Sequence, residues 1–347
     1  FLLCHFGIGC LQRGFMRRCS IMTRTTPRTT TLATMIRHTT TMITRRIIDD
    51  SLLFVLKLCL TLQKHAKPHL SMVTQNNTIV VIGNGFDLNL GLPTSYQDFI
   101  KSPQFQRLLQ TDNHLYTYLK DKYHLHNWVD IENELQKYSY DYTATNREEF
   151  RLEYNELCKC LCSYLNTIDL QGINKDSFAY KTLCNFINEE QVTIINFNYT
   201  DTVNHIIMDA NLSAMNKGIK IYNIHGSALK YDIVFGVEDT ARINNDDMFL
   251  LKATQQAFKP IDLASKLEVA KNVVFLGHSL GSTDHHYFLK FFTRQALDHA
   301  NRKTIIITCY KEEGRLNIWK SIRKLTQNSP TELQIRNNVN IVDLETL

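Results

Sequence analysis

The amino-acid sequence predicts an α/β protein with a mostly parallel β-sheet and helices on its faces. Short apolar runs rich in β-branched residues recur along the chain without polar alternation, as strands buried on both faces require. Several of these runs are followed by stretches with helical periodicity, and strands that alternate with helices favour a parallel sheet. A long interval after the first strand, about 100–190, has no strand pattern, which predicts a helical insertion.

The individual elements follow from these patterns. The expected strands are, in chain order, 78–83 (TIVVIG), 192–197 (VTIINF), 219–226 (IKIYNIHG), 232–236 (DIVFG), 273–277 (VVFLG), 303–308 (KTIIIT) and 340–344 (NIVDL). In the insertion, NWVDIENELQKYSY and REEFRLEYNELCKCLCSYLNTI carry apolar residues at spacings of three and four, which predicts amphipathic helices. DHHYFLKFFTRQALDHA predicts another helix after VVFLG.

The first fifth of the chain differs from the rest. Residues 1–71 carry 11 Lys or Arg against two Asp, and they show no sustained periodicity. The sequence begins at Phe1, so we interpret this part as a non-globular leader: disordered, or an over-extended gene model whose true start is Met72. A mitochondrial targeting peptide is the alternative. SLLFVLKLCLTL is shorter than the ~20 residues that cross a bilayer, so no membrane association is expected, and the globular domain is predicted at 72–347.

Charge and cysteine content restrict the function classes. Residues 72–347 contain 28 basic and 32 acidic residues, so bulk charge does not support nucleic-acid binding. Cys158, Cys160 and Cys162 lie two residues apart in a helical segment, where they cannot all face one metal, and Cys184 and Cys309 form no C-x-x-C pair. A reduced, cytoplasmic protein without a metal site is therefore expected.

Polar or glycine-rich segments follow several predicted strands, and the carboxyl ends of parallel strands are where ligands bind. In GNGFD (83–87), the glycines let the backbone approach a ligand and leave N–H groups pointing outward. In NFNYTD (196–201), Asn198 and Asp201 are expected near the same edge, although Asp201 could equally be a helix N-cap. His225 ends a strand before Gly226, a position suited to acid–base chemistry, while a structural histidine is the alternative.

GHSLGSTD (277–284) follows VVFLG and permits two interpretations. Gly277, Ser279 and Gly281 spell G-x-S-x-G, the nucleophile-elbow pattern of esterases. A glycine-rich turn between a strand and a helix can instead bind a phosphate. The only histidines after Ser279 lie in or at the end of the next helix, and an esterase would need one after a later strand. We therefore predict a phosphate-and-ribose loop.

Six segments are weak signals individually, but their order along the chain is a specific family pattern. They are IGNGFDLNLGLPTSY, W-x-x-x-E in NWVDIENEL, NFNYTD, IHG, FGVED and GHSLGSTD. This series, over about residues 78–310, closely resembles the AbiH family of bacterial abortive-infection proteins. The resemblance implies antiviral defence, a phage-derived trigger and a possible homo-oligomer. AbiH proteins in turn resemble distant sirtuins, which have a Rossmann-like NAD-binding fold. Sirtuins space the Asn and Asp as N-x-D, whereas this chain has N-x-x-D, and it lacks their zinc-binding cysteines, so deacetylation is not expected.

The sirtuin resemblance assigns roles to ten residues. It implies that NAD, or a related small nucleotide, contacts Gly83, Asn84, Gly85, Asp87, Asp201, Gly277, Ser279 and Asp284, with no metal. Asn198 and His225 would then catalyse hydrolysis of the nicotinamide–ribose bond. Two alternatives remain: a defence module that senses a nucleotide without cleaving it, and a hydrolase with Ser279 as nucleophile.

Overall fold

A computed structural model describes residues 77–111, 113–126, 130–141, 147–188, 192–210, 219–298 and 301–344. The predicted leader, with its apolar segment and Met72, lies outside the described residues. Among the described helices, none combines the length and the apolarity that crossing a bilayer requires.

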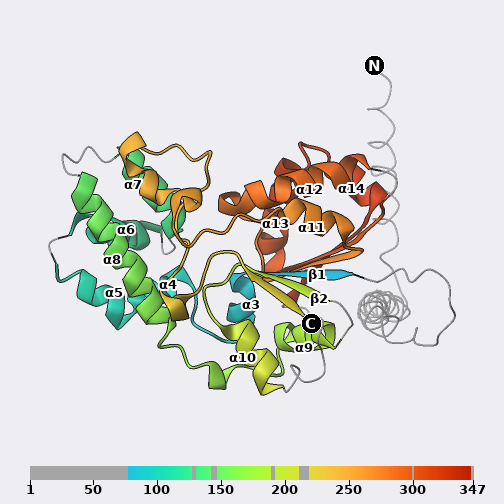
Figure 1. The fold of residues 1–347 in the computed structure, drawn as a ribbon, viewed down its shortest axis with the longest axis horizontal. Helices are drawn as coiled ribbons and strands as arrows, with labels where there is room; N and C mark the ends of the chain where they lie inside the picture. Colours follow the sequence, from blue (N-terminus) through green and yellow to red (C-terminus); the bar gives the residue numbers. More distant parts are fainter. Residues whose placement is uncertain are drawn as a thin grey trace, which may run out of the picture. The chain divides into compact units, whose positions relative to one another are not determined.

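The described residues form one six-stranded, all-parallel sheet with the strand order β3-β2-β1-β4-β5-β6 (Figure 1). The strands are β1 (Thr78–Ile82), β2 (Val192–Asn196), β3 (Lys220–Asn223), β4 (Asn272–Leu276), β5 (Thr304–Cys309) and β6 (Asn338–Asp343). This is the strand order of doubly wound dinucleotide-binding folds. The predicted α/β, Rossmann-like fold class is confirmed.

The central strand shows why these sequences form strands buried on both faces. All five residues of β1 are buried. Ile79 and Val81 pack into one hydrophobic cluster, whereas Val80 and Ile82 pack into another on the opposite face. Successive side chains of a strand point to opposite faces, so a continuous apolar run fits only a sheet with helices on both sides.

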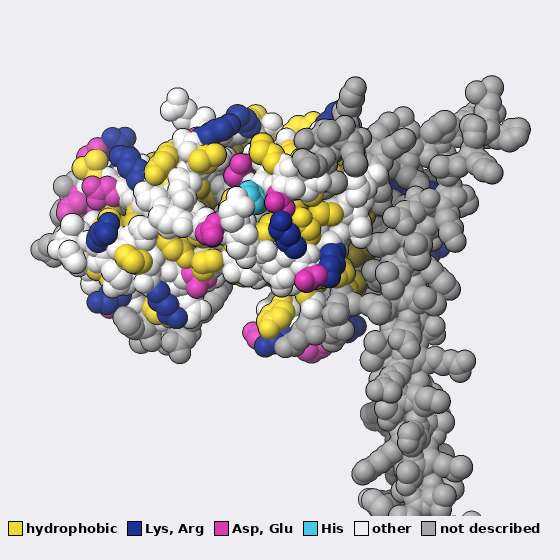
Figure 2. Space-filling view, turned by 90° about the horizontal axis from the view of Figure 1, so that it is seen from below, with side chains coloured by type: hydrophobic (Ala, Val, Ile, Leu, Met, Phe, Trp, Pro, Cys, Tyr) yellow, Lys and Arg dark blue, Asp and Glu magenta, His cyan; other side chains and the backbone are white. Residues whose placement is uncertain are grey.

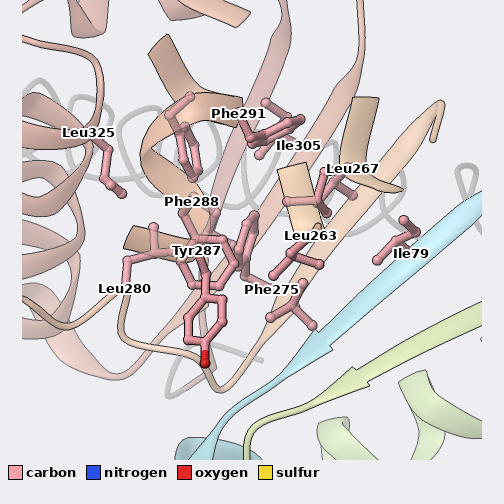
Figure 3. Close-up of a cluster of buried hydrophobic side chains, with 14 of the residues drawn as sticks. Ile79, Leu263, Leu267, Phe275, Leu280, Tyr287, Phe288, Phe291, Ile305 and Leu325 are labelled. Carbon is pink, nitrogen blue, oxygen red and sulfur yellow. The ribbon is translucent and has the colours of Figure 1, made fainter. Parts of the chain in front are cut away.

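Helices cover the two faces of the sheet. One face carries α3 (Asn84–Asn89), α9 (Phe178–Ile187) and α10 (Thr202–Asp209). The other carries α11 (Leu263–Val269), α12 (His285–Leu297), α13 (Lys311–Leu325) and α14 (Pro330–Arg336). This second cluster includes several aromatic residues, and Phe275 of β4 meets Phe288 of α12 at a ring-centroid distance of 5.4 Å (Figure 3).

The predicted insertion, about 100–190, is helical; its part up to Leu165 has its own core, whereas α9 at its end packs on the sheet. The helices of the first part are α4 (Tyr96–Lys101), α5 (Pro103–Leu108), α6 (His114–His126), α7 (Ile131–Asp141) and α8 (Arg147–Leu165). They lie beside the sheet rather than on either face (Figure 1). Their apolar faces pack together with Phe235, Leu250 and Leu251, which belong to the long connection between β3 and α11. That connection therefore joins the insertion to the sheet.

One predicted strand is absent: residues 232–236 form a loop. The segment is apolar because Val234 and Phe235 are buried, but its backbone pairs with other partners. The N–H of Val234 donates to the carbonyl of His225 at 2.8 Å, and the side chain of Gln255 bonds both backbone groups of Phe235. Side-chain hydrogen bonds replace the ladder that a strand would need.

The sheet register brings three loops together. Ile82, at the end of β1, pairs with Asn196 of β2 on one side and with Leu276 of β4 on the other. The chain therefore leaves all three strands at one level. Strand order reverses between β1 and β4, and this switch point is where open α/β sheets bind ligands.

Candidate functional site

A cavity of about 510 Å³ lies at the carboxyl ends of these strands. Nine of the ten residues that the sequence analysis selects line it: Gly83, Asn84, Gly85, Asp87, Asn198, His225, Gly277, Ser279 and Asp284. Side chains of the insertion, including Tyr96 and Tyr164, line it from the other side. The topology alone thus gathers residues that lie far apart in the sequence.

Asp201 is the exception, because it does not line the cavity. It lies at the start of α10, and its carboxylate accepts a hydrogen bond from the Asn204 amide at 2.6 Å. Asp201 is thus the N-cap residue of α10 by position, but its carboxylate bonds a side chain and caps no backbone N–H of the helix.

The glycines bring two turns into backbone contact. Gly277 has φ +68°, and a Cβ there would lie 2.0 Å from the nitrogen of Phe86. A Cβ on Gly85 would lie 2.8 Å from the carbonyl oxygen of Gly277. The N–H groups of Gly83 and Gly85 donate to the carbonyls of Leu276 and Gly277, at 3.3 and 2.8 Å. These two N–H groups, which the sequence analysis expects to bind phosphate, instead join the turns.

Ser279 does not have the geometry of a nucleophile elbow. It is exposed, and five residues separate it from the start of α12, whereas an elbow places the serine on the sharp turn itself. The neighbouring His278 offers no base, because its Nδ1 accepts the N–H of Leu280 at 3.0 Å. Ser279 lines the cavity as a polar hydroxyl.

Asn198 is held over the cavity by a turn that starts in β2. The N–H of Asn198 donates to the side-chain oxygen of Asn196 at 3.1 Å, and Asn196 is itself tied to Asn223 of β3. Asn198 is buried, yet its Nδ2 has no hydrogen-bond partner among the described residues. A buried amide donor without a partner is costly to a fold, which points to a ligand acceptor.

Asp87 forms the floor of the cavity and is fully buried. Its Oδ2 accepts the hydroxyl of Thr200 at 2.5 Å, while Oδ1 has no partner within the described part of the chain. Burial raises the pKa of Asp87 to about 6, partly offset by the hydroxyls of Thr200 and Thr202 and by the side-chain amide of Asn198. The carboxylate is ready to accept a hydroxyl of a ligand.

Replacing Asp87 by asparagine should remove a pH-dependent destabilisation. The folded protein binds the Asp87 proton more tightly than the unfolded chain does, so wild-type stability falls as pH rises from about 4 to about 6. Asp87→Asn can still accept the hydrogen bond of the Thr200 hydroxyl. We expect it to reduce this pH-dependent loss in the free energy of unfolding by up to about 3 kcal/mol. Urea denaturation at pH 4.5 and 7 measures it, and an unchanged pH dependence would contradict it.

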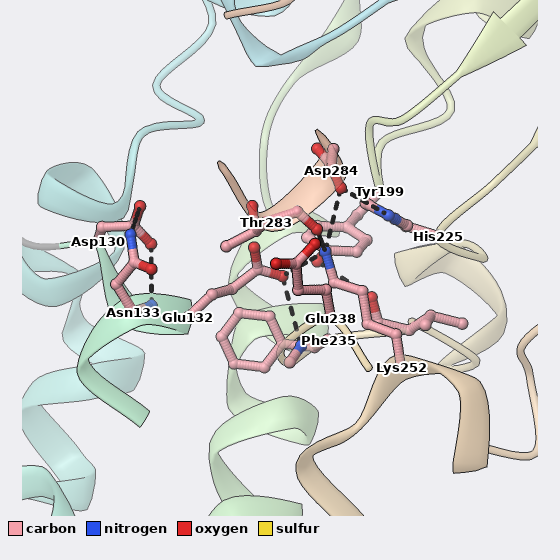
Figure 4. A network of polar contacts seen from close by, with 12 residues as sticks. Asp130, Glu132, Asn133, Tyr199, His225, Phe235, Glu238, Lys252, Thr283 and Asp284 are labelled. Atoms are coloured by element: carbon pink, nitrogen blue, oxygen red, sulfur yellow. Dashed lines mark hydrogen bonds and ion pairs between the residues drawn. The ribbon is translucent and has the colours of Figure 1, made fainter. Parts of the chain in front are cut away.

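Asp284 is the centre of a buried polar cluster (Figure 4). Its Oδ1 lies 3.4 Å from His225 Nε2 and 3.2 Å from Lys252 Nζ, and its Oδ2 lies 3.7 Å from His278 Nε2. Lys252 Nζ also lies 3.3 Å from Glu132 Oε1. These residues come from the insertion, the β3–α11 connection and the β4–α12 loop, so the cluster links all three.

The charges of the cluster follow from its contacts. Burial alone would raise the pKa of Asp284, but Lys252 and His225 hold it well below its usual value. Burial lowers the pKa of His225, and the Lys252 ammonium lowers it further. At neutral pH an ionised Asp284 therefore faces a neutral His225. The carboxylate favours the tautomer with the proton on Nε2, which leaves Nδ1 as the basic nitrogen.

Three members of the cluster have no role in the sequence analysis: Glu132, Lys252 and His278. Glu132 is the glutamate of W-x-x-x-E, and His278 lies inside GHSLG. Lys252 is a single lysine in the apolar run MFLLKAT, the signal that could have identified it, because lysine is almost never fully buried without a partner.

The charge distribution limits the kind of ligand. Four carboxyl groups, from Asp87, Asp130, Glu132 and Asp284, line the cavity, and no Lys or Arg does so among the described residues. On the face shown in Figure 2, acidic and basic side chains are interspersed rather than gathered in one patch. Neither distribution resembles a nucleic-acid groove. Within the described residues, no group of three His, Cys, Asp or Glu side chains could hold a metal ion.

Fold and site together define an α/β protein with a polar ligand cavity at the switch point of a doubly wound sheet. The chain matches the family described as "Bacteriophage abortive infection AbiH" over residues 79–307. It therefore belongs to the AbiH family of phage abortive-infection proteins. No curated protein matches the chain.

Proposed function

We propose that this protein binds NAD, or a closely related nucleotide, and hydrolyses its nicotinamide–ribose bond as the effector step of abortive infection. The observation that carries the proposal is the pairing of a neutral His225 with an ionised Asp284 in the wall of the switch-point cavity. Such a pair supplies an oriented general base. The resemblance of the family to sirtuins makes NAD the first candidate substrate.

The residues of the site have separate roles in this reaction. His225 Nδ1 accepts a proton from water as the water oxygen bonds to C1′ of the ribose. The bond from C1′ to the nicotinamide nitrogen breaks, and its electron pair neutralises the cationic ring. Nicotinamide, ADP-ribose and a proton are the products. The carboxyl groups of the cavity stabilise the positive charge that develops on the ribose.

The unpaired polar atoms of the site fit the ribose of this substrate. Asn198 Nδ2 is a buried donor and Asp87 Oδ1 a buried acceptor; neither makes a hydrogen bond of normal geometry among the described residues, and the two side chains lie close enough for the Asn198 amide to lower the pKa of Asp87. A ribose presents hydroxyl groups that both donate and accept, so it can satisfy the two atoms together. Because two of the expected backbone donors are already engaged, the exposed Ser279 hydroxyl is the group we assign to the phosphates.

The test is NAD concentration in cells that express the full chain, before and during phage infection. We expect infection to lower NAD in cells with the parent protein and not with the double variant His225→Ala, Asn198→Ala. Nicotinamide and ADP-ribose should accumulate together, because hydrolysis yields both.

Unchanged NAD in cells that still resist the phage would overturn the proposal. Recovery of the purified protein with an intact nucleotide bound would then favour a sensing module. Labelling of Ser279 by a phosphonate probe would favour a serine hydrolase.

A further inference from the structure

Lys252 is the most buried cation of the described structure that contacts the site. Its side chain is 1% exposed, and it does not line the cavity. The ammonium contacts the carboxylates of Glu132 and Asp284 and lies 3.5 Å from the carbonyl oxygen of Thr283. Three oxygen acceptors thus surround a group that cannot touch a ligand.

The position of Lys252 couples it to His225 through a shared oxygen. Lys252 Nζ and His225 Nε2 both contact Oδ1 of Asp284, at 3.2 and 3.4 Å. The Asp284 carboxylate thus lies between an ammonium and an imidazole, and its charge favours the ring orientation that turns Nε2 toward it. The ammonium also repels a second positive charge on that ring.

We propose that Lys252 is a positioning residue for the reaction proposed above: its ammonium, anchored by Glu132 of the insertion, fixes the Asp284 carboxylate that orients His225 and opposes protonation of the ring. The inference rests on the proposed function for its catalytic meaning. Its effect on His225 can be measured without any turnover.

Electrostatics supports this role. Burial would lower the pKa of Lys252, but Asp284 and Glu132 raise it above its usual value, so the lysine stays charged. Burial raises the pKa of Glu132 to about 7, and Lys252 opposes that rise. One ammonium therefore favours the ionised form of two buried carboxyl groups: Asp284 is ionised at neutral pH, whereas Glu132 is only partly ionised.

The neighbouring ionisable groups define what else could change with pH. They are Asp130 and Tyr96 of the insertion, Tyr199, His278 of the β4–α12 loop, His286 and Tyr287 of α12, and Glu238 and Asp239, which face His286. Burial lowers the pKa of His278 to about 4. His278 is therefore uncharged at neutral pH.

The experiment titrates His225 by NMR in the full chain with labelled histidine, in the parent and in Lys252→Met. Removing the ammonium leaves the attraction of Asp284 unopposed, so His225 should take up its proton at higher pH, with a proton affinity at least about tenfold higher. Lys252→Arg keeps the charge and should titrate nearer the parent. His225→Gln identifies the resonance.

Lys303→Met is the matched control. Lys303 is also buried, and its ammonium donates to the carbonyls of Glu268 and Ala270, at the end of the sheet away from the cavity. Replacing it should cost stability and leave the titration of His225 unchanged. If Lys252→Met does not fold, the same titration is measured in the double variant Lys252→Met, Glu132→Gln. This variant has one buried carboxylate fewer that lacks a cation.

Kinetics provides the second readout. In Lys252→Met, kcat should fall by about 10²-fold, the lower end of what a positioned base contributes, while KM changes little because Lys252 does not touch the ligand. The acid limb of the pH profile should move to higher pH with the NMR titration. An unchanged His225 titration in Lys252→Met would overturn the inference. A parent that does not cleave NAD would overturn the proposed function alone, because the NMR result stands by itself.

Discussion

Replacing His225 by alanine should lower NAD hydrolysis by about 10²- to 10⁴-fold, the contribution of a positioned general base. The substitution removes the imidazole that we assign as the general base, which faces Asp284 at 3.4 Å in the wall of the cavity. NAD binding should persist, because the unpaired atoms of Asn198 and Asp87 remain. Steady-state rates of nicotinamide release by the purified full chain measure the effect.

His205→Ala is the matched control for this prediction. His205 belongs to α10 and does not line the cavity, so its loss should leave the rate unchanged. In the parent, the rate should fall at acidic pH with a midpoint below the ordinary histidine pKa of about 6.5, since burial lowers the pKa of His225. Full activity in a folded His225→Ala variant would make this histidine structural and refute the mechanism.

The sheet could be predicted because its strands are buried on both faces. TIVVI and NVVFL carry no polar alternation, and only a central strand of a covered sheet requires such runs. The same criterion fails at 232–236, where Val234 and Phe235 are equally apolar. Phe235 is buried against the insertion, where Gln255 supplies its backbone hydrogen bonds, and the N–H of Val234 donates to the carbonyl of His225. Apolar content predicts that a segment is buried, but it does not predict which groups form hydrogen bonds with its backbone.

The residues of the candidate site also fall into those that the sequence could predict and those that it could not. Residues that directly follow strands, such as Asn198 and His225, could be predicted because parallel strands end at one edge. The role of Lys252 could not be predicted: its place in an apolar run indicates burial, but its role depends on Glu132 and Asp284, which other elements bring to it. The exact use of the glycines was also hidden. Tight packing of two turns and binding of a phosphate both require glycine, so the sequence cannot distinguish them. The hydrogen-bond partners of the glycine N–H groups can.

Replacing Gly277 by alanine should produce the largest loss of stability at the site. The residue has φ +68°, where an L side chain costs about 1–2 kcal/mol. Its Cβ would also lie 2.0 Å from the nitrogen of Phe86 and 2.4 Å from the carbonyl carbon of Gly85. Both are backbone atoms, so the two turns must separate, at a further cost of about 1–3 kcal/mol. We expect a total loss of about 2–5 kcal/mol.

Gly91→Ala separates the two contributions to this loss. Gly91 also has a left-handed backbone, with φ +85°, but a Cβ there would meet nothing within 4 Å. It should therefore cost only the conformational part, about 1–2 kcal/mol, in urea denaturation. The difference between the variants measures the contact between the β1 and β4 turns. Because these turns form one wall of the cavity, Gly277→Ala should also weaken NAD binding, whereas Gly91→Ala should not. Equal losses of stability would show that the turns can separate freely and that packing does not explain the glycine.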